Sequence, residues 1–199
     1  YVRNSDAFWA VYDYDNIRPA LFDFRMSLRR ECDKYMSTLD YILPEYDIVI
    51  HYRVGDFLTI SKPIDPNSIV RVVRGLGLTR DVRVAILDGG MSHFTTDYTR
   101  SQSQRLKQQI HEGCLRLGDN FTVESVSISV DMDFMLCVYA PVLITGAGSF
   151  AVTAAIGNTT GIIRTPACGN TNFCSNSRQR AAELIADNWS TYRFDCVDL

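Results

Sequence analysis

The sequence predicts an α/β fold, a Rossmann-like parallel sheet covered by helices on both faces. Short apolar runs rich in valine and isoleucine alternate along the 199 residues with segments whose apolar side chains recur every three or four positions. The short runs are apolar at nearly every position, which is typical of strands buried on both faces. The chain has no internal repeat and no linker rich in proline, glycine or serine, so nothing in it indicates a second core.

The first four elements follow from periodicity and helix-start signals. A helix is expected from Pro19, a residue suited to a first helical turn, because apolar residues follow at helical spacing as far as Met36. Residues 46–52 form a β-branched run short enough to be a buried strand. Asp65-Pro66 supplies an N-cap and a first-position proline for the next helix, and residues 82–87 are expected to form the next strand.

The remaining elements continue the alternation. The expected order is a helix over about 101–117, a strand at 121–128, a helix at 131–139, a strand at 142–145, a helix at 150–156, a strand at 161–164 and a helix at 177–189. An acidic residue in a first helical turn is commonly a cap, a role that we favour for Asp131 over Asp133.

Composition excludes several classes of protein. With 20 Lys+Arg against 23 Asp+Glu, the net charge of −3 removes the broad basic field of a nucleic-acid coat, so we expect no nucleic-acid partner. No stretch approaches the roughly 18–20 apolar residues of a membrane span. Three histidines without metal-ligand spacing predict no metal site.

Cysteines and glycosylation triplets favour the secretory pathway, meaning the ER or Golgi lumen or the extracellular space. The six cysteines permit up to three disulfides, and the short loop between Cys168 and Cys174 could close on itself. N-x-S/T triplets begin at Asn120, Asn158 and Asn188. A leader or anchor is then expected to have been removed. The competing interpretation is that the triplets are chance and the cysteines are small core residues.

Two strand ends carry candidate chemistry, because ligands of such sheets lie outside the carboxyl ends of the strands. His51 ends one strand and is followed by Arg53, Gly55 and Asp56, an arrangement suited to bidentate binding of a phosphate by an arginine that Asp56 orients. The strand at 142–145 passes through small residues into a helix.

The start of that helix is a candidate anion site. Gly148 and Ser149 precede Phe150 there, so free N–H groups and the Ser149 hydroxyl face the same edge of the sheet. A plain strand-to-helix turn is the alternative.

These residues resemble the motifs of GDP-fucose-dependent fucosyltransferases. His51 to Asp56 is similar to the H-x-R-x-G-D signature of the α1,2-fucosyltransferases and, more loosely, of the protein O-fucosyltransferases. Asp133, sixteen residues before Ser149, resembles the start of the family's second block, which ends in a Ser-Phe pair.

The resemblance implies a metal-independent, inverting transfer of fucose from GDP-fucose to a glycan or glycoprotein acceptor, with no other cofactor. At the matching positions, Arg53 is implied to clamp the donor diphosphate, and Gly148, Ser149 and Phe150 to contact the donor. Asp133 is implied to read the guanine. His51 and Asp56 are candidates for the catalytic base by location alone.

The family's fold is GT-B, and this chain resembles its C-terminal, donor-binding half. We therefore expect residues 1–45 to be a helical remnant of an acceptor half and residues 46–199 to be the donor domain. Val54 stands where the family has a second basic residue, and small apolar residues flank Ser149 where the family has polar and aromatic ones. Two alternatives are open. One is a non-catalytic glycan-binding or structural member of the fold, and the other is an unrelated secreted Rossmann-like domain with a coincidental motif.

Overall fold

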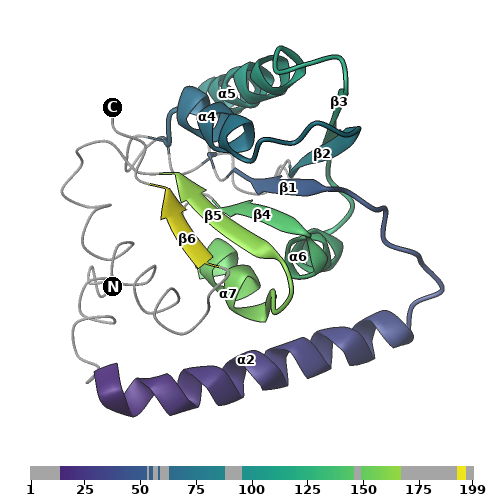
Figure 1. The fold of residues 1–199 in the computed structure, drawn as a ribbon, viewed down its shortest axis with the longest axis vertical. Coiled ribbons are helices and arrows are strands. Elements are labelled where there is room, and N and C mark those ends of the chain that lie inside the picture. The colour runs from purple at the N-terminus through teal and green to yellow at the C-terminus, as the bar shows by residue number, and fades with distance from the viewer. Residues whose placement is uncertain are drawn as a thin grey trace.

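A computed structural model describes residues 14–52, 54–55, 58, 63–87, 96–145, 149–166 and 192–195. Over these residues the chain forms one six-stranded sheet in the order β3-β2-β1-β4-β5-β6, with every neighbouring pair parallel (Figure 1). The strands are β1 (Ile48–His51), β2 (Val82–Leu87), β3 (Phe121–Val126), β4 (Val142–Thr145), β5 (Ile162–Pro166) and β6 (Tyr192–Asp195). The predicted α/β class with a Rossmann-like parallel sheet is confirmed.

Helices lie on both faces of this sheet (Figure 1). The helices are α2 (Tyr14–Ser37), α4 (Pro66–Gly75), α5 (Asp97–Leu115), α6 (Val130–Tyr139) and α7 (Ser149–Gly157). Helices α4 and α5 cover one face, and α6 and α7 cover the other. Helix α2 lies outside α6 and α7 and contacts both of them.

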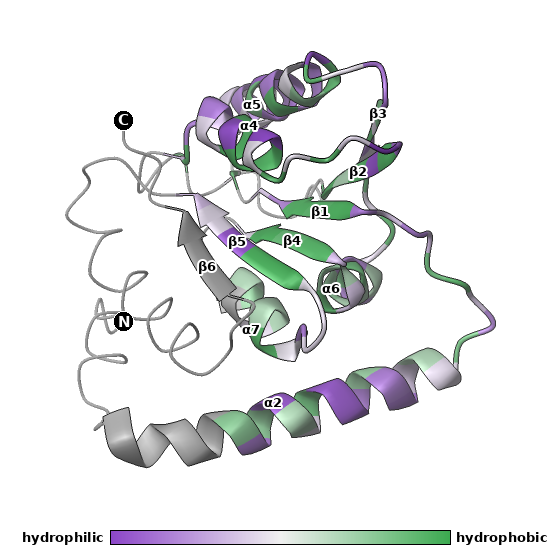
Figure 2. Cartoon of the chain, viewed as in Figure 1, coloured by the Kyte–Doolittle hydropathy of each residue, from purple (hydrophilic) through white to green (hydrophobic). Residues whose placement is uncertain are grey.

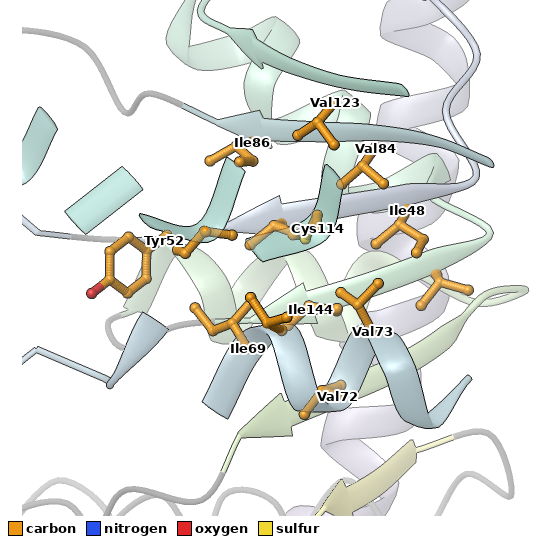
Figure 3. Close-up of a cluster of buried hydrophobic side chains, with 14 of the residues drawn as sticks. Ile48, Tyr52, Ile69, Val72, Val73, Val84, Ile86, Cys114, Val123 and Ile144 are labelled. Carbon is orange, nitrogen blue, oxygen red and sulfur yellow. The ribbon is translucent and has the colours of Figure 1, made fainter. Parts of the chain in front are cut away.

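Two apolar layers hold the helices to the sheet. Alternate residues of β1 point to opposite faces, so Ile48 and Ile50 enter the layer under α4 and α5 while Val49 enters the layer under α6 and α7. Figure 3 shows the first layer, in which Ile69 and Val73 of α4 approach the strands. The central strands β1 and β4 are hydrophobic except at their last residues (Figure 2), as expected of strands buried on both faces.

Side-chain caps define where the helices begin. Asp65 caps α4 as predicted, because its carboxylate accepts the Asn67 N–H at 3.1 Å and Pro66 occupies the first turn. Helix α5 begins at Asp97, four residues before the predicted 101, since Thr96 and Thr99 form a capping box. Ser129 caps α6 by accepting the Met132 N–H at 3.2 Å. The prediction that Asp131 is the cap is therefore wrong.

Two elements differ from the sequence prediction at the chain's ends. Helix α2 begins at Tyr14 and not at Pro19, so Pro19 lies in the second turn, where it cannot donate the backbone hydrogen bond that another residue would make. Strand β6 was not predicted, although Tyr192 and Phe194 alternate with charged residues there. The helix predicted at 177–189 lies outside the described residues.

The cysteines that the structure describes are core residues. Cys32, Cys114 and Cys137 are buried free thiols. Burial raises the pKa of Cys114 to about 12, and burial together with the nearby Asp133 carboxylate raises the pKa of Cys137 further. These three thiols therefore match the core interpretation. The predicted Cys168–Cys174 bridge lies outside the described residues.

One predicted glycosylation site is incompatible with the folded chain. Asn158 is fully buried, and its amide nitrogen donates to the carbonyls of Cys137 (3.0 Å) and Ala140 (2.9 Å). A glycan on that nitrogen would require these contacts to break. Glycosylation at Asn120 stays a prediction, and Asn188 lies outside the described residues.

Candidate functional site

The strand order reverses beside β1. The chain runs outward from β1 to β2 and β3, then returns to β4 on the other side of β1. His51, the last residue of β1, lies between Leu87 of β2 and Thr145 of β4. In open α/β sheets the connections diverge at such a point and leave a crevice outside the carboxyl ends of the strands, where ligands bind.

An aromatic cluster occupies the α6 and α7 side of this edge. The His51 ring stacks on Phe150 of α7, with 4.8 Å between ring centroids and 20° between planes. Phe134 of α6 meets Phe150 edge-on, with centroids 5.4 Å apart and planes at 84°. The cluster joins three separate elements at the end of β1, and Phe134 and Phe150 are only partly buried, so part of their surface is exposed.

Hydroxyl groups lie at or next to the carboxyl ends of β4 and β5. The Thr145 hydroxyl of β4 lies 2.6 Å from the Thr165 hydroxyl of β5, and both residues are buried. Because Thr145 pairs with His51 in the sheet, the two hydroxyl groups lie at the same carboxyl edge as the aromatic cluster.

The α4 and α5 side of the edge is fixed by the segment after β1. Tyr52 is buried and donates its hydroxyl hydrogen to the Ile64 carbonyl at 2.7 Å. Gly55 has a φ of 46°, a conformation that favours glycine, and its N–H donates to the Ser103 hydroxyl of α5 at 3.0 Å. The chain is therefore anchored to α5 four residues after β1 ends.

Asp133 has a structural contact in the first turn of α6. It is 6% exposed, and its Oδ1 accepts the Ile128 N–H at 3.2 Å, which ties the β3–α6 connection to the helix. A backbone-holding role in this turn was predicted for its neighbour Asp131. The donor-binding role inferred for Asp133 stays a prediction.

The structure brings some of the predicted site residues together. His51 and Phe150 are in contact, and Ser149 is the first residue of α7, so the free N–H groups of that helix start at the carboxyl end of β4. Arg53, Asp56 and Gly148 lie outside the described residues. Their predicted roles therefore stay predictions.

Sequence reasoning missed several polar and aromatic residues of this edge. Phe134, Thr145, Ser103 and Lys107 were given no role. A signal existed for Ser103 and Lys107, because both are polar residues in helical register with the inward-facing Ile110. Thr145 could have been found as the polar residue that ends an otherwise apolar strand.

A cavity of about 430 Å³ lies at the opposite, amino edge of the sheet. Its lining includes Tyr46, Asp47, Arg83 and Tyr139. Two of the charged side chains there have partners: the Asp47 carboxylate accepts the Arg83 backbone N–H at 2.8 Å, and the Arg83 guanidinium lies 3.3 Å from Glu124. Strand topology therefore places the candidate site at the carboxyl edge and not in this cavity.

The described part of the chain contains neither a metal-binding cluster nor a membrane-spanning helix. Within those residues no group of three or more His, Cys, Asp or Glu side chains is placed to hold a metal ion. None of the described helices has the length and apolar character needed to cross a bilayer.

The fold defines a class of protein, the doubly wound α/β domain, in which ligands commonly bind at a switch point such as that between β1 and β4. No family model matches the chain, and no solved structure matches it significantly. A 23S rRNA (uracil(1939)-C(5))-methyltransferase, RlmD, of Neisseria lactamica is 35% identical over 65 residues. The match covers 33% of this chain and 14% of that enzyme.

These comparisons correct the functional interpretation of the motifs. The similarity is to an RNA methyltransferase and not to a fucosyltransferase, so the inferred membership of the fucosyltransferase family, transfer of fucose from GDP-fucose and a Golgi enzyme were wrong. The motif His51 to Asp56 is short, and such a pattern recurs by chance more readily than a whole fold does. Location in the secretory pathway stays a prediction.

Proposed function

We propose that this chain is the donor-binding domain of a transferase, and that its donor carries a nucleoside held at the carboxyl ends of β1 and β4. The observation that carries the proposal is the reversal of strand order beside His51, with His51 stacked on Phe150 at that point. Nucleotides bind at this position in doubly wound sheets because the strand connections diverge there and helix N-termini face the phosphates.

The aromatic cluster supplies a surface for a base. Stacking a base on an aromatic ring contributes about 1–3 kcal/mol, and Phe150 is a partly buried ring of this cluster. The first turn of α7 lies next to it and offers N–H groups to an anionic part of the same donor.

The similarity to a uracil methyltransferase supports a transferase and favours a methyl donor. The general biological methyl donor, S-adenosylmethionine, contains adenosine and therefore fits a nucleoside site. A nucleoside diphosphate donor is the second candidate, because the start of α7 suits phosphate. Metal-independent chemistry remains part of the proposal.

Isothermal titration with S-adenosylhomocysteine and with adenosine, guanosine and uridine diphosphates tests the site. We expect one of these to bind, and Phe150→Ala to weaken it about tenfold or more through lost stacking. The matched control is Phe121→Ala, which removes a buried ring from β3, away from β1 and β4. If none of the probes binds the folded wild-type chain at millimolar concentration, the proposal is wrong.

A further inference from the structure

The cavity at the amino edge of the sheet has a volume of about 430 Å³, and every residue that lines it belongs to the described part of the chain. Pockets that hold small organic ligands commonly measure about 300–1,000 Å³. The lining comes from the α2–β1 connection, from β1 and β2, and from the end of α6 with the turn that follows it (Figure 1). A ligand in this cavity would therefore contact segments that are far apart in the sequence.

The most buried part of the lining is apolar. It consists of the core residues Val49, Leu136 and Ala140, each at most 3% exposed. Tyr46 and Tyr139 add aromatic rings to the lining. The Arg83 guanidinium lies 4.9 Å from the centroid of the Tyr46 ring, and the Arg29 guanidinium lies 4.1 Å from that of Tyr139. Aromatic faces attract cations in this way, so the lining suits an apolar body and is compatible with a positive charge.

The charged groups of the cavity favour a cation over an anion. The Asp47 carboxylate accepts the Arg83 backbone N–H at 2.8 Å and lies 2.6 Å from the Arg80 guanidinium. The Arg83 guanidinium lies 3.3 Å from Glu124. Glu45 also lines the cavity, and within the described residues its carboxylate has no hydrogen bond or ion pair. An anionic ligand would have to displace a carboxylate from an arginine, whereas a cationic ligand would meet an available carboxylate at Glu45.

The backbone on both sides of Glu45 is restrained. Two residues later, the Asp47 N–H donates to the Arg83 carbonyl at 2.9 Å, and the Asp47 carbonyl accepts the Val142 N–H at 3.2 Å. The preceding residue is Pro44, whose ring fixes its own φ. The Glu45 carboxylate is therefore held near the cavity by the start of the sheet, which lowers the entropic cost of binding.

We propose that this cavity binds a small organic amine, with the apolar body of the amine against Val49 and Leu136 and its ammonium group paired with Glu45. A carboxylate accepts a charge-assisted hydrogen bond from an ammonium group. Because Glu45 is exposed, that pair contributes modestly, and removal of the apolar body from water contributes the rest. The amine site lies at the edge opposite to the donor site and does not depend on the proposed function.

The test uses three ligands that share a phenylethyl body and differ in charge. Phenethylamine is cationic at pH 7, 2-phenylethanol is neutral and 3-phenylpropionate is anionic. Backbone amide shifts of the full chain are followed during titration with each. We expect phenethylamine to give saturable shifts at Glu45, Tyr46, Asp47 and Tyr139, and to bind about tenfold or more tightly than 3-phenylpropionate, with 2-phenylethanol between them.

Glu45→Gln removes the proposed partner of the ammonium group. Because Glu45 is exposed, the variant should fold, which the unchanged amide spectrum away from the cavity checks. We expect it to weaken phenethylamine about fivefold or more and to leave 2-phenylethanol within about twofold. The matched control is Glu112→Gln on α5, which removes a half-exposed carboxylate on the other face of the sheet and should leave both ligands unaffected.

Several results would overturn the amine site. One is equal affinity for phenethylamine and 2-phenylethanol, with no effect of Glu45→Gln on either. Another is tighter binding of 3-phenylpropionate, which would assign the cavity to anions through Arg83. Phenethylamine shifts that do not saturate, or that spread over carboxylates elsewhere such as Glu112, would show nonspecific attraction of a cation. Absence of shifts at millimolar ligand would show that the cavity does not bind this class.

Discussion

Asn158 shows how one buried residue can join three elements through its side chain and its backbone carbonyl. Its amide nitrogen donates to the carbonyls at the end of α6, at Cys137 and Ala140, and its amide oxygen accepts the Gly161 N–H at 2.7 Å just before β5. The backbone carbonyl oxygen of Asn158 accepts a hydrogen bond from the buried Arg25 of α2 at 3.4 Å. The role of Asn158 is therefore structural hydrogen bonding, and the N-x-S/T triplet that suggested glycosylation does not account for it.

Replacing Asn158 with alanine should strongly destabilise the domain. The change leaves two carbonyls and one N–H buried without these partners, and we expect a loss of about 2–4 kcal/mol in the free energy of unfolding, measured by urea denaturation. Asn120→Ala is the control, because it removes one exposed hydrogen bond to the Arg80 carbonyl and should cost about 1 kcal/mol or less. Similar losses for the two variants would contradict the joining role of Asn158.

Helix packing between α4 and α5 depends on Gly113. An alanine at this position would place its Cβ 2.5 Å from Val70 Cγ2, so Gly113→Ala should lower the free energy of unfolding by about 1–3 kcal/mol. Val70→Ala in the same chain removes the conflicting atom and should recover much of that loss. Gly75→Ala, which meets nothing within 4 Å, should change stability little. Urea unfolding of the wild type, the three single variants and the double variant checks this, and additive losses from Gly113→Ala and Val70→Ala would contradict close packing.

Helix α2 is attached to α6 by a group of ionisable side chains. The Tyr139 hydroxyl donates to Asp33, Arg29 pairs with Asp33 at 2.9 Å, and the Arg29 guanidinium lies 4.1 Å from the centroid of the Tyr139 ring. The Tyr139 hydrogen bond, followed by Arg29, lowers the pKa of Asp33 against the opposing effect of burial.

This attachment predicts an acid-sensitive contribution to stability. Because the pKa of Asp33 is lower in the folded chain, the contribution is fully present above the unfolded value, near 4, and is lost as the pH falls through the folded value. Tyr139→Phe keeps the ring and removes the hydroxyl, so its stability deficit should be larger at pH 7 than at pH 3. Asp33 is well exposed, which limits the effect to about 1 kcal/mol or less.

The measurement is urea unfolding at both pH values, with the exposed Tyr98→Phe as control. A deficit for Tyr139→Phe that does not change with pH would show that its hydroxyl does not act through Asp33.

At the scale of the whole molecule, the sequence was sufficient to predict the fold class but not to identify the donor. The buried strands and the Asp65 cap could be predicted because periodicity and capping are local properties. The caps at Thr96 and Ser129 were missed although both precede their helices directly. Strand β6 has four residues and is identified by its pairing with β5, a long-range contact.

The location of the candidate site could be predicted from the sequence, but several of the residues that form it could not. Strand order puts His51 and Phe150 at one edge, and the rule that ligands lie at the carboxyl ends of strands found both. Ser103 and Lys107 come from a helix whose rotation about its axis depends on packing with α4. The short sequence motifs led to the wrong donor. They indicate an anion site but do not include the residues that other elements contribute around it.

Chemical-shift mapping of backbone amides tests the central claim most directly. Titration with S-adenosylhomocysteine or a nucleoside diphosphate should shift the amides of His51, Gly55, Thr145 and Phe150, which surround the switch between β1 and β4. Saturable shifts confined to this edge are the result we predict. Shifts centred on the amino-edge cavity around Arg83, or no shifts at millimolar ligand, would contradict a donor site at the carboxyl ends of β1 and β4.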